Sequence, residues 1–205
     1  MTYGLFFGDS ITYGEYDGVF GGWVDILKRY ALQKYNEGAN ELILFNLGIG
    51  GETSEGLVRR IQNEMTARNS EDGNVVFLGY GANDLAVKDG NQIVNPGQFK
   101  ANIEKAIQEA QNFTEDIFLV SILPISDKIN GEISVTGKVR TNEDVLVYNQ
   151  ILKDIVAENS LSYIDFHSAF LEDKEILLSK DGVHPNEKGY GMMAEIAIPI
   201  IEKYL

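Results

Sequence analysis

The chain has 205 residues, of which 44% are hydrophobic and 23% are charged, a composition typical of a folded protein rather than a disordered one. Its 31 acidic and 17 basic residues give a net charge of −14, which repels nucleic acid backbones and anionic lipid surfaces and so predicts neither as a partner. The chain has no cysteine, which excludes disulfides, thiolate nucleophiles and Cys-ligated metals and is in keeping with a cytoplasmic protein.

Five short apolar segments, each bounded by Gly, Asn, Asp or Ser, have the composition of buried strands. In chain order they are 3–7, 42–47, 75–78, 117–122 and 162–164. Between them, four stripes of apolar residues have the spacing of a helix face. They run from Trp23 to Tyr30, Leu57 to Met65, Phe99 to Ala110 and Val145 to Ile155. Alternating strands and helices predict an α/β protein whose parallel sheet is covered on both faces, and we expect one domain over residues 1–205.

Local signals refine this outline. Asn95 and Pro96 should be the N-cap and first residue of the third helix. A final helix should follow Asn186, and Pro199 should kink it or end its first half. Residues 126–142 show no clear periodicity, which predicts a hairpin or a mobile flap.

Neither end of the sequence predicts export or membrane insertion. Residues 1–10 have no basic start and no apolar stretch of the kind that secretory signals contain. The apolar run 196–201 lies between Glu195 and Glu202, far short of the ~18 residues of a membrane-spanning helix. We therefore expect a cytoplasmic protein with no stable membrane insertion.

Small and polar residues gather after four of the predicted elements. They are Gly8-Asp9-Ser10, Asn46 with residues 48–54, Gly81-Ala82-Asn83-Asp84, and Asp181-Gly182-Val183-His184-Pro185. In open α/β sheets, ligands bind in the crevice outside the carboxyl ends of the strands. We therefore expect these four segments to meet at one site.

Convergence of these segments would give each polar residue a chemical task. Ser10, in a tight strand-to-helix turn, is the candidate nucleophile and His184 its base. Asp181, three residues before His184, could accept the proton-bearing imidazole nitrogen and hold the ring. The backbone N–H groups of Ser10 and Gly51 and the side-chain amide of Asn83 could stabilise the oxyanion of a tetrahedral intermediate.

These segments resemble the sequence blocks of the GDSL esterases, also called SGNH hydrolases. Gly8-Asp9-Ser10-Ile11 is similar to the opening block, and Gly51, Asn83 and the Asp181–His184 pair match the other three in order. The resemblance implies a three-layer α/β/α flavodoxin-like sandwich with five parallel strands in the order 2-1-3-4-5. It also implies hydrolysis of esters or thioesters through a serine acyl-enzyme, without metal or cofactor. Ile11 replaces the family's leucine, and Glu52 follows Gly51 where aspartate is commoner.

Each of these residues also has a structural interpretation. Ser10 could simply cap a helix, and Asn83 could be a turn residue. His167, preceded by Asp165, is the only rival to His184 as a base, although a histidine in such a place is usually structural. We expect Asp9 to support the Ser10 loop by accepting backbone hydrogen bonds. Asp84 is expected to be structural.

Two aromatic residues close to the candidate nucleophile bear on the substrate. Tyr13 and Tyr16 lie in a glycine-rich segment and could line an acyl or leaving-group pocket. The loops 11–22, 85–94 and 126–142 should determine specificity, and they contain few large apolar residues. We therefore expect a small-molecule ester with a short acyl group, such as acetyl. A lysophospholipase or lipase of the same family is the main alternative.

Two other functions fit the same predicted fold. A flavin-binding redox protein could use Ser10, Thr12 and Gly14 to cradle a phosphate, although Asp9 in that loop opposes it. A receiver-type signalling domain could bind Mg²⁺ through Asp9 and Asp84, but this leaves Gly51, Asn83 and His184 unexplained. The oligomeric state is not predicted by the sequence.

Overall fold

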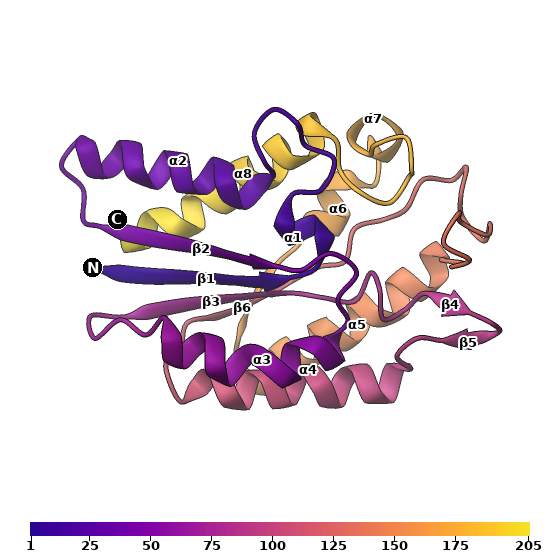
Figure 1. Ribbon diagram of the computed structural model, residues 1–205, viewed down its shortest axis with the longest axis horizontal. Coiled ribbons are helices and arrows are strands. Elements are labelled where there is room, and N and C mark those ends of the chain that lie inside the picture. The colour runs from indigo at the N-terminus through magenta and orange to yellow at the C-terminus, as the bar shows by residue number, and fades with distance from the viewer.

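The computed structural model describes all residues, 1–205, and its centre is a five-stranded parallel sheet (Figure 1). The order of the strands across the sheet is β2-β1-β3-β6-β7, which is 2-1-3-4-5 when only the strands of this sheet are numbered. Their bounds are β1 Thr2–Gly8, β2 Leu42–Gly48, β3 Asn74–Gly79, β6 Ile117–Val120 and β7 Ser162–Ile164. The predicted fold class and strand order are confirmed.

Helices cover both faces of the sheet, as Figure 1 shows, with α2 and α8 on one side and α3 and α4 on the other. The long helices are α2 Trp23–Asn36, α3 Ser54–Ala67, α4 Pro96–Gln111, α5 Asn142–Asn159 and α8 Glu187–Ile201. The apolar stripes predicted from the sequence are the faces that these helices bury. Asn95 caps α4 by accepting the Gln98 N–H, and Pro96 is the first helical residue, as predicted.

The hydrophobic core is split by the sheet into two layers because successive strand residues point to opposite faces. Leu5 and Phe7 pack with the buried faces of α3, α4 and α5. Phe6 points the other way, toward α2 and α8, and its ring stacks on Phe77 with the centroids 4.1 Å apart. Because both faces are buried, the strands are apolar at nearly every position.

The register of the sheet brings three loops to one level. Gly8, the last residue of β1, pairs with Gly48 of β2 and with Gly79 of β3, so the three strands end together. A side chain on Gly8 would collide with Thr12, and one on Gly48 would collide with the backbone of Tyr13. The glycines therefore let the turn after β1 fold closely over the strand ends.

The remaining elements are short and lie mostly at the carboxyl edge of the sheet. They are the helices α1 Ser10–Tyr13, α6 Phe166–Phe170 and α7 Lys174–Leu177, the 3₁₀ helix Glu202–Tyr204, and the antiparallel pair β4 Val87–Lys88 and β5 Asn91–Gln92. The sequence patterns did not predict them. No helix has the length and apolar character needed to cross a membrane.

Two expectations about irregular features are corrected or refined. Pro199 lies inside α8, which continues to Ile201, so the expectation that this proline ends the first half of the helix is wrong. Proline has no N–H, so position 199 costs the helix one backbone hydrogen bond, but α8 does not end there. Residues 126–142 contain a hairpin-like turn, in which Ser134 and Lys138 are hydrogen-bonded and Ile133 bridges Val139.

Candidate active site

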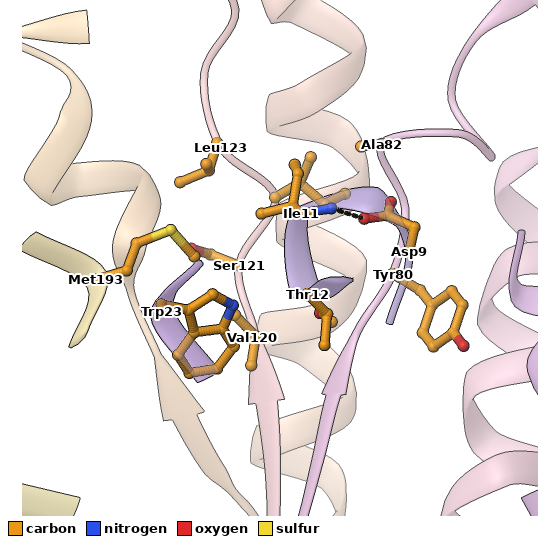
Figure 2. A pocket seen from close by; sticks show the side chains of 12 residues that line it. Asp9, Ile11, Thr12, Trp23, Tyr80, Ala82, Val120, Ser121, Leu123 and Met193 are labelled. Atoms are coloured by element: carbon orange, nitrogen blue, oxygen red, sulfur yellow. Dashed lines mark hydrogen bonds between the residues drawn. The ribbon is translucent and has the colours of Figure 1, made fainter. Parts of the chain in front are cut away.

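Ser10 is the first residue of the short helix α1, directly after the central strand β1. Asp9 caps this helix because its carboxylate accepts the Ile11 N–H at 2.9 Å, as Figure 2 shows. Gly14 ends it in the left-handed conformation, with φ of 93°. One turn of helix between two caps therefore holds Ser10 at the carboxyl edge of the sheet.

His184 and Asp181 lie in a loop that closes on itself before α8. Ser179 donates its backbone N–H to the His184 carbonyl at 2.7 Å, and Leu178 forms a bridge with Pro185. One oxygen of Asp181 accepts the backbone N–H groups of Val183 and His184 at 3.0 and 3.1 Å. Its other oxygen accepts Nδ1–H of His184 at 2.6 Å. The loop therefore fixes the imidazole with Nε2 facing away from Asp181.

The Asp181 carboxylate is held in its ionised form. Burial raises its pKa, but the hydrogen bonds from the His184 ring, the Ser179 hydroxyl and the Val183 N–H outweigh burial, so the pKa lies well below its ordinary value. An ionised carboxylate at Nδ1 holds the tautomer in which Nε2 can accept a proton. Asp181 can thus orient His184 and stabilise the imidazolium.

The hydroxyl of Ser10 meets this ring. Ser10 Oγ lies 2.7 Å from His184 Nε2, although the two residues are 174 positions apart in the chain. A Glu15 carboxylate oxygen lies 3.9 Å from the same nitrogen. The structure thus brings Ser10, His184 and Asp181 into one hydrogen-bonded chain. It places His167 on α6 instead, where burial lowers the pKa of the ring and the backbone N–H donates to Ser121.

Gly51 lies in the turn after β2, with φ of 76° and no atom within 4 Å of where a Cβ would be. Its neighbour Glu52 is braced by Arg60 of α3 through Nε at 3.0 Å and Nη2 at 2.7 Å, and by the Tyr80 hydroxyl at 2.7 Å. Arg60 also donates to the Leu47 carbonyl. The N–H of Gly51 has no partner within the protein and borders the pocket that contains Ser10. Ser10, at the start of α1, has one of the N–H groups that a helix leaves unbonded.

Asn83 lies in the loop after β3, and only 6% of it is exposed. Its amide nitrogen donates to Asp9 Oδ2 at 3.3 Å and to the Glu52 carbonyl at 3.2 Å. These contacts are at the long end of the range for hydrogen bonds, so a stronger acceptor can compete for the amide. Asp84, the next residue, turns away and accepts the backbone N–H and the hydroxyl of Ser54, a structural role at the start of α3.

The five residues Ser10, Gly51, Asn83, Asp181 and His184 line one pocket of about 510 Å³. Tyr16 lines it as well, and its ring lies 5.0 Å from the His184 ring. Tyr13, 60% exposed, is not among the lining residues. The far wall belongs to the segment 129–140, which contributes Lys138 and Arg140. Sequence reasoning missed Glu15, Lys138 and Arg140 because nothing near them in the sequence indicates which residues they will contact.

A second, much smaller cavity is bordered by Asp9, Ile11 and Thr12, which belong to the turn after β1 (Figure 2). It has a volume of about 20 Å³, and Trp23 and Met193 are among its other lining residues. Its volume suits one water molecule, which excludes it as an acyl pocket. The side chains of Thr12 and Asp84, which the flavin and receiver hypotheses would need at a ligand, are buried. No cluster of three or more His, Asp or Glu side chains is arranged to hold a metal ion.

This arrangement supplies the parts that acyl transfer needs. A hydroxyl is hydrogen-bonded to a base, the base is oriented by a carboxylate, and amide donors line the same pocket. Such a site can form a covalent ester on Ser10 and stabilise an oxyanion beside it.

Comparisons with known proteins agree with this chemistry. The family model described as "GDSL-like Lipase/Acylhydrolase family" matches residues 6–192. The isoamyl acetate-hydrolyzing esterase of Saccharomyces cerevisiae is 25% identical over 209 aligned residues, covering 98% of this chain and 86% of the yeast protein. The lipase/acylhydrolase from Enterococcus faecalis has a TM-score of 0.80 and 25% identity, covering 100% of this chain and 97% of that one. A lipolytic protein of the G-D-S-L family from Veillonella parvula has a TM-score of 0.77 and 26% identity, covering 99% and 100%.

Proposed function

The chain belongs to the GDSL-like lipase/acylhydrolase family, and we propose that this serine ester hydrolase acts on small carboxylic esters with a short acyl group, such as acetyl. The observation that carries the proposal is the chain of hydrogen bonds from Ser10 Oγ through His184 to Asp181, at 2.7 and 2.6 Å. Family membership leaves no need for the flavin-binding and receiver hypotheses.

In the proposed reaction, Ser10 Oγ attacks the ester carbonyl while His184 Nε2 takes its proton. The backbone N–H groups of Ser10 and Gly51 and the amide of Asn83 stabilise the oxyanion. When the tetrahedral intermediate collapses, His184 gives the proton to the leaving alkoxide, and the alcohol departs from an acyl-Ser10 ester. Water, deprotonated by His184, then releases the acid and restores Ser10. Asp181 stays ionised throughout and stabilises the imidazolium.

Two observations support a short acyl group. Only 7 of the 19 residues that line the pocket are hydrophobic, a poor match for a long alkyl chain. The yeast relative is described as hydrolysing isoamyl acetate, an acetyl ester. The opposing observation concerns Ile133 and Val135, which are exposed at the tip of the loop bordering the pocket and favour the lipase alternative.

Substitution of the proposed nucleophile and base tests the mechanism. We expect Ser10→Ala and His184→Ala each to abolish hydrolysis of p-nitrophenyl acetate while the circular dichroism spectrum stays that of the wild type. His167→Gln is the control for the loss of a histidine and should keep most of the activity. Wild-type rates in either of the first two variants would show that the mechanism is wrong.

A series of p-nitrophenyl esters with acyl chains of two to twelve carbons tests the substrate class. We expect kcat/KM to be highest for the acetyl or butyryl ester. A maximum at eight or more carbons would support the lipase alternative and refute the short-acyl proposal.

A further inference from the structure

Lys138 and Arg140 reach across the pocket to Asn83. The Asn83 amide oxygen accepts a hydrogen bond from Lys138 Nζ at 3.3 Å and another from Arg140 Nη2 at 3.2 Å. Arg140 Nε also donates to the carbonyl of Ala82 at 2.7 Å. Arg140 therefore holds both the backbone before Asn83 and the side chain of Asn83 itself.

The backbone of the loop explains why these two side chains reach the same residue. Val139, between them, pairs with Val87 through two backbone hydrogen bonds of 2.8 and 2.9 Å, so the segment is extended. In an extended segment, residues two apart point to the same face. Lys138 and Arg140 consequently share the face that borders the pocket.

The contacts of Lys138 and Arg140 determine the orientation of the Asn83 side-chain amide, that is, which side its oxygen faces and which side its nitrogen faces. An amide oxygen that accepts two charged donors cannot exchange places with the amide nitrogen, because the nitrogen would then face two further donors. The nitrogen must accordingly lie on the side of Asp9 and Glu52. Hydrogen bonds from cations to the oxygen also polarise the amide, which makes its N–H groups better donors.

Lys138 and Arg140 are not needed merely to anchor the loop. The loop is already closed by the Val87–Val139 pair, by the Gly131 N–H on the Arg140 carbonyl and by the turn at Ser134. Burial lowers the pKa of both Lys138 and Arg140, so holding the two charges together here is unfavourable. The carboxylate of Asp9 partly offsets this for both cations, and that of Asp181 does so for Arg140.

We propose that Lys138 and Arg140 are positioning residues for the oxyanion donor: they fix the Asn83 side chain with its N–H groups on the side of Asp9 and Glu52, where an oxyanion can compete for them, and they polarise the amide. This inference rests on the proposed function, since it assigns Asn83 the role of a donor to the oxyanion. Because both cations act through Asn83, their effect should depend on that residue.

A double-mutant cycle tests the coupling. We expect Lys138→Met to lower kcat for p-nitrophenyl acetate about tenfold with little change in KM, since full removal of an oxyanion donor costs about 10²–10³ in kcat. In an Asn83→Ala background, Lys138→Met should have no further effect. Arg140→Lys keeps the charge but loses the guanidinium group that donates to Ala82 and Asn83 at once, so it should also lower kcat.

Lys180 provides the matched control. It borders the same pocket and is exposed, and no hydrogen bond joins it to Asn83. Lys180→Met removes the same charge from the pocket, so it measures the effect of charge alone on kcat, and Lys138→Met should lower kcat several-fold more. The proposal would be overturned if Lys138→Met and Lys180→Met lowered kcat equally. It would also be overturned if Lys138→Met lowered kcat by the same factor in the Asn83→Ala background as in the wild type.

A measurement independent of activity separates this inference from the proposed function. In ¹⁵N-labelled protein, the side-chain NH₂ resonances of Asn83 can be assigned by their absence from the Asn83→Ala spectrum. We expect them to shift in Lys138→Met and to stay in place in Lys180→Met. If the wild type hydrolyses no ester, the proposed function fails while this spectrum still tests the contact. Unchanged Asn83 resonances in Lys138→Met would overturn the positioning role.

Discussion

Asp9 shows how one side chain can serve two neighbours at the site. One oxygen accepts the Ile11 N–H and caps α1, and the other accepts the Asn83 amide. Burial raises its pKa from 3.8 to about 6, although the Ile11 N–H and the charges of His184 and Arg140 oppose the rise and Asp84 adds to it. The carboxylate is thus retained at an energetic cost beside the proposed oxyanion donor.

The substitution Asp9→Asn should separate these two roles. Asparagine caps a helix as well as aspartate does, so we expect the Tm to be unchanged or higher. Its NH₂ group would face the NH₂ group of Asn83, however, and kcat for p-nitrophenyl acetate should fall about tenfold. Asp9→Ala, which also removes the cap, should lose about 1 kcal/mol of stability in addition. Wild-type kcat in Asp9→Asn would mean that the contact with Asn83 has no role in activity.

At the residue scale, the sequence indicated candidate site residues where residues close by in the chain mark them out. Asp181 and His184 are three residues apart, and Ser10 directly follows a strand. Lys138 and Arg140 lie 55 and 57 positions from Asn83, and their contacts depend on how an irregular loop folds back. No local pattern encodes such a contact, so it could be found only in the structure.

Among the elements, the loop from Gly14 to Gly22 determines where Tyr16 lies over His184. Asp17 closes it by accepting the backbone N–H groups of Val19, Phe20 and Gly22 at 2.9 to 3.0 Å. The two end glycines touch: a Cβ on Gly22, where φ is 88°, would collide with the Cα of Gly14. Gly22 is also the N-cap of α2. The loop can therefore close only with glycine at this position.

Two alanine substitutions in this loop test the close approach. Gly22→Ala combines a left-handed backbone with a backbone collision, so we expect a loss of more than about 2 kcal/mol in the free energy of unfolding, measured by urea titration. Gly18→Ala is the matched control, because no atom lies within 4 Å of where its Cβ would be. Its stability should stay within about 0.5 kcal/mol of the wild type. A similar loss in both variants would contradict the collision.

Element length decided how well the sequence predicted the secondary structure. Four of the long helices were predicted because their apolar stripes repeat the helical period, and the five strands because they are apolar runs bounded by Gly, Asn, Asp or Ser. The strands β4 and β5 have 2 residues each, and α1 and α7 have 4, too few to show a period. The positions of these short elements are set by the longer elements that they connect. The loops around the pocket, which contain several of them, were therefore the least predictable part of the structure.

A buried polar network ties together the half of the molecule that contains α3 and α4. Asp84 accepts from Ser54, Ser54 accepts the Asn102 amide at 2.9 Å, and Asn102 accepts Gln98 at 2.8 Å. The second oxygen of Asp84 is buried without a partner. Burial raises the pKa of Asp84 to about 6, against the hydrogen bonds from Ser54. The whole fold therefore contains a carboxylate that is costly to ionise.

The ionisation of Asp84 should affect how the free energy of unfolding of the whole protein depends on pH. Because the folded state binds the proton of Asp84 more tightly than the unfolded chain does, the contribution of Asp84 to stability falls as the pH rises from about 4 to about 6 and stays lower above that range. Asp84→Asn never ionises. The stability that this variant gains over the wild type, measured by urea titration, should therefore be about 2 kcal/mol larger at pH 8 than at pH 4.5.

The pH range isolates this effect from the proposed triad. Asp181, whose pKa is lowered, stays ionised in the folded protein throughout. Asp154→Asn, on the exposed face of α5, is the control for the substitution itself and should show no such difference. The same difference between the two pH values for both variants would mean that Asp84 is not the group responsible.

The distance of 174 residues between Ser10 and His184 has a consequence for how the protein comes into being. A ribosome adds about 5–20 residues per second, so the serine waits roughly 10 to 35 s before its partner histidine has been made. During that interval the nascent chain contains a serine hydroxyl with no base beside it. Esterase activity should therefore be absent until His184 has been made and has folded against Ser10, so the onset of activity marks a late step in folding of the chain.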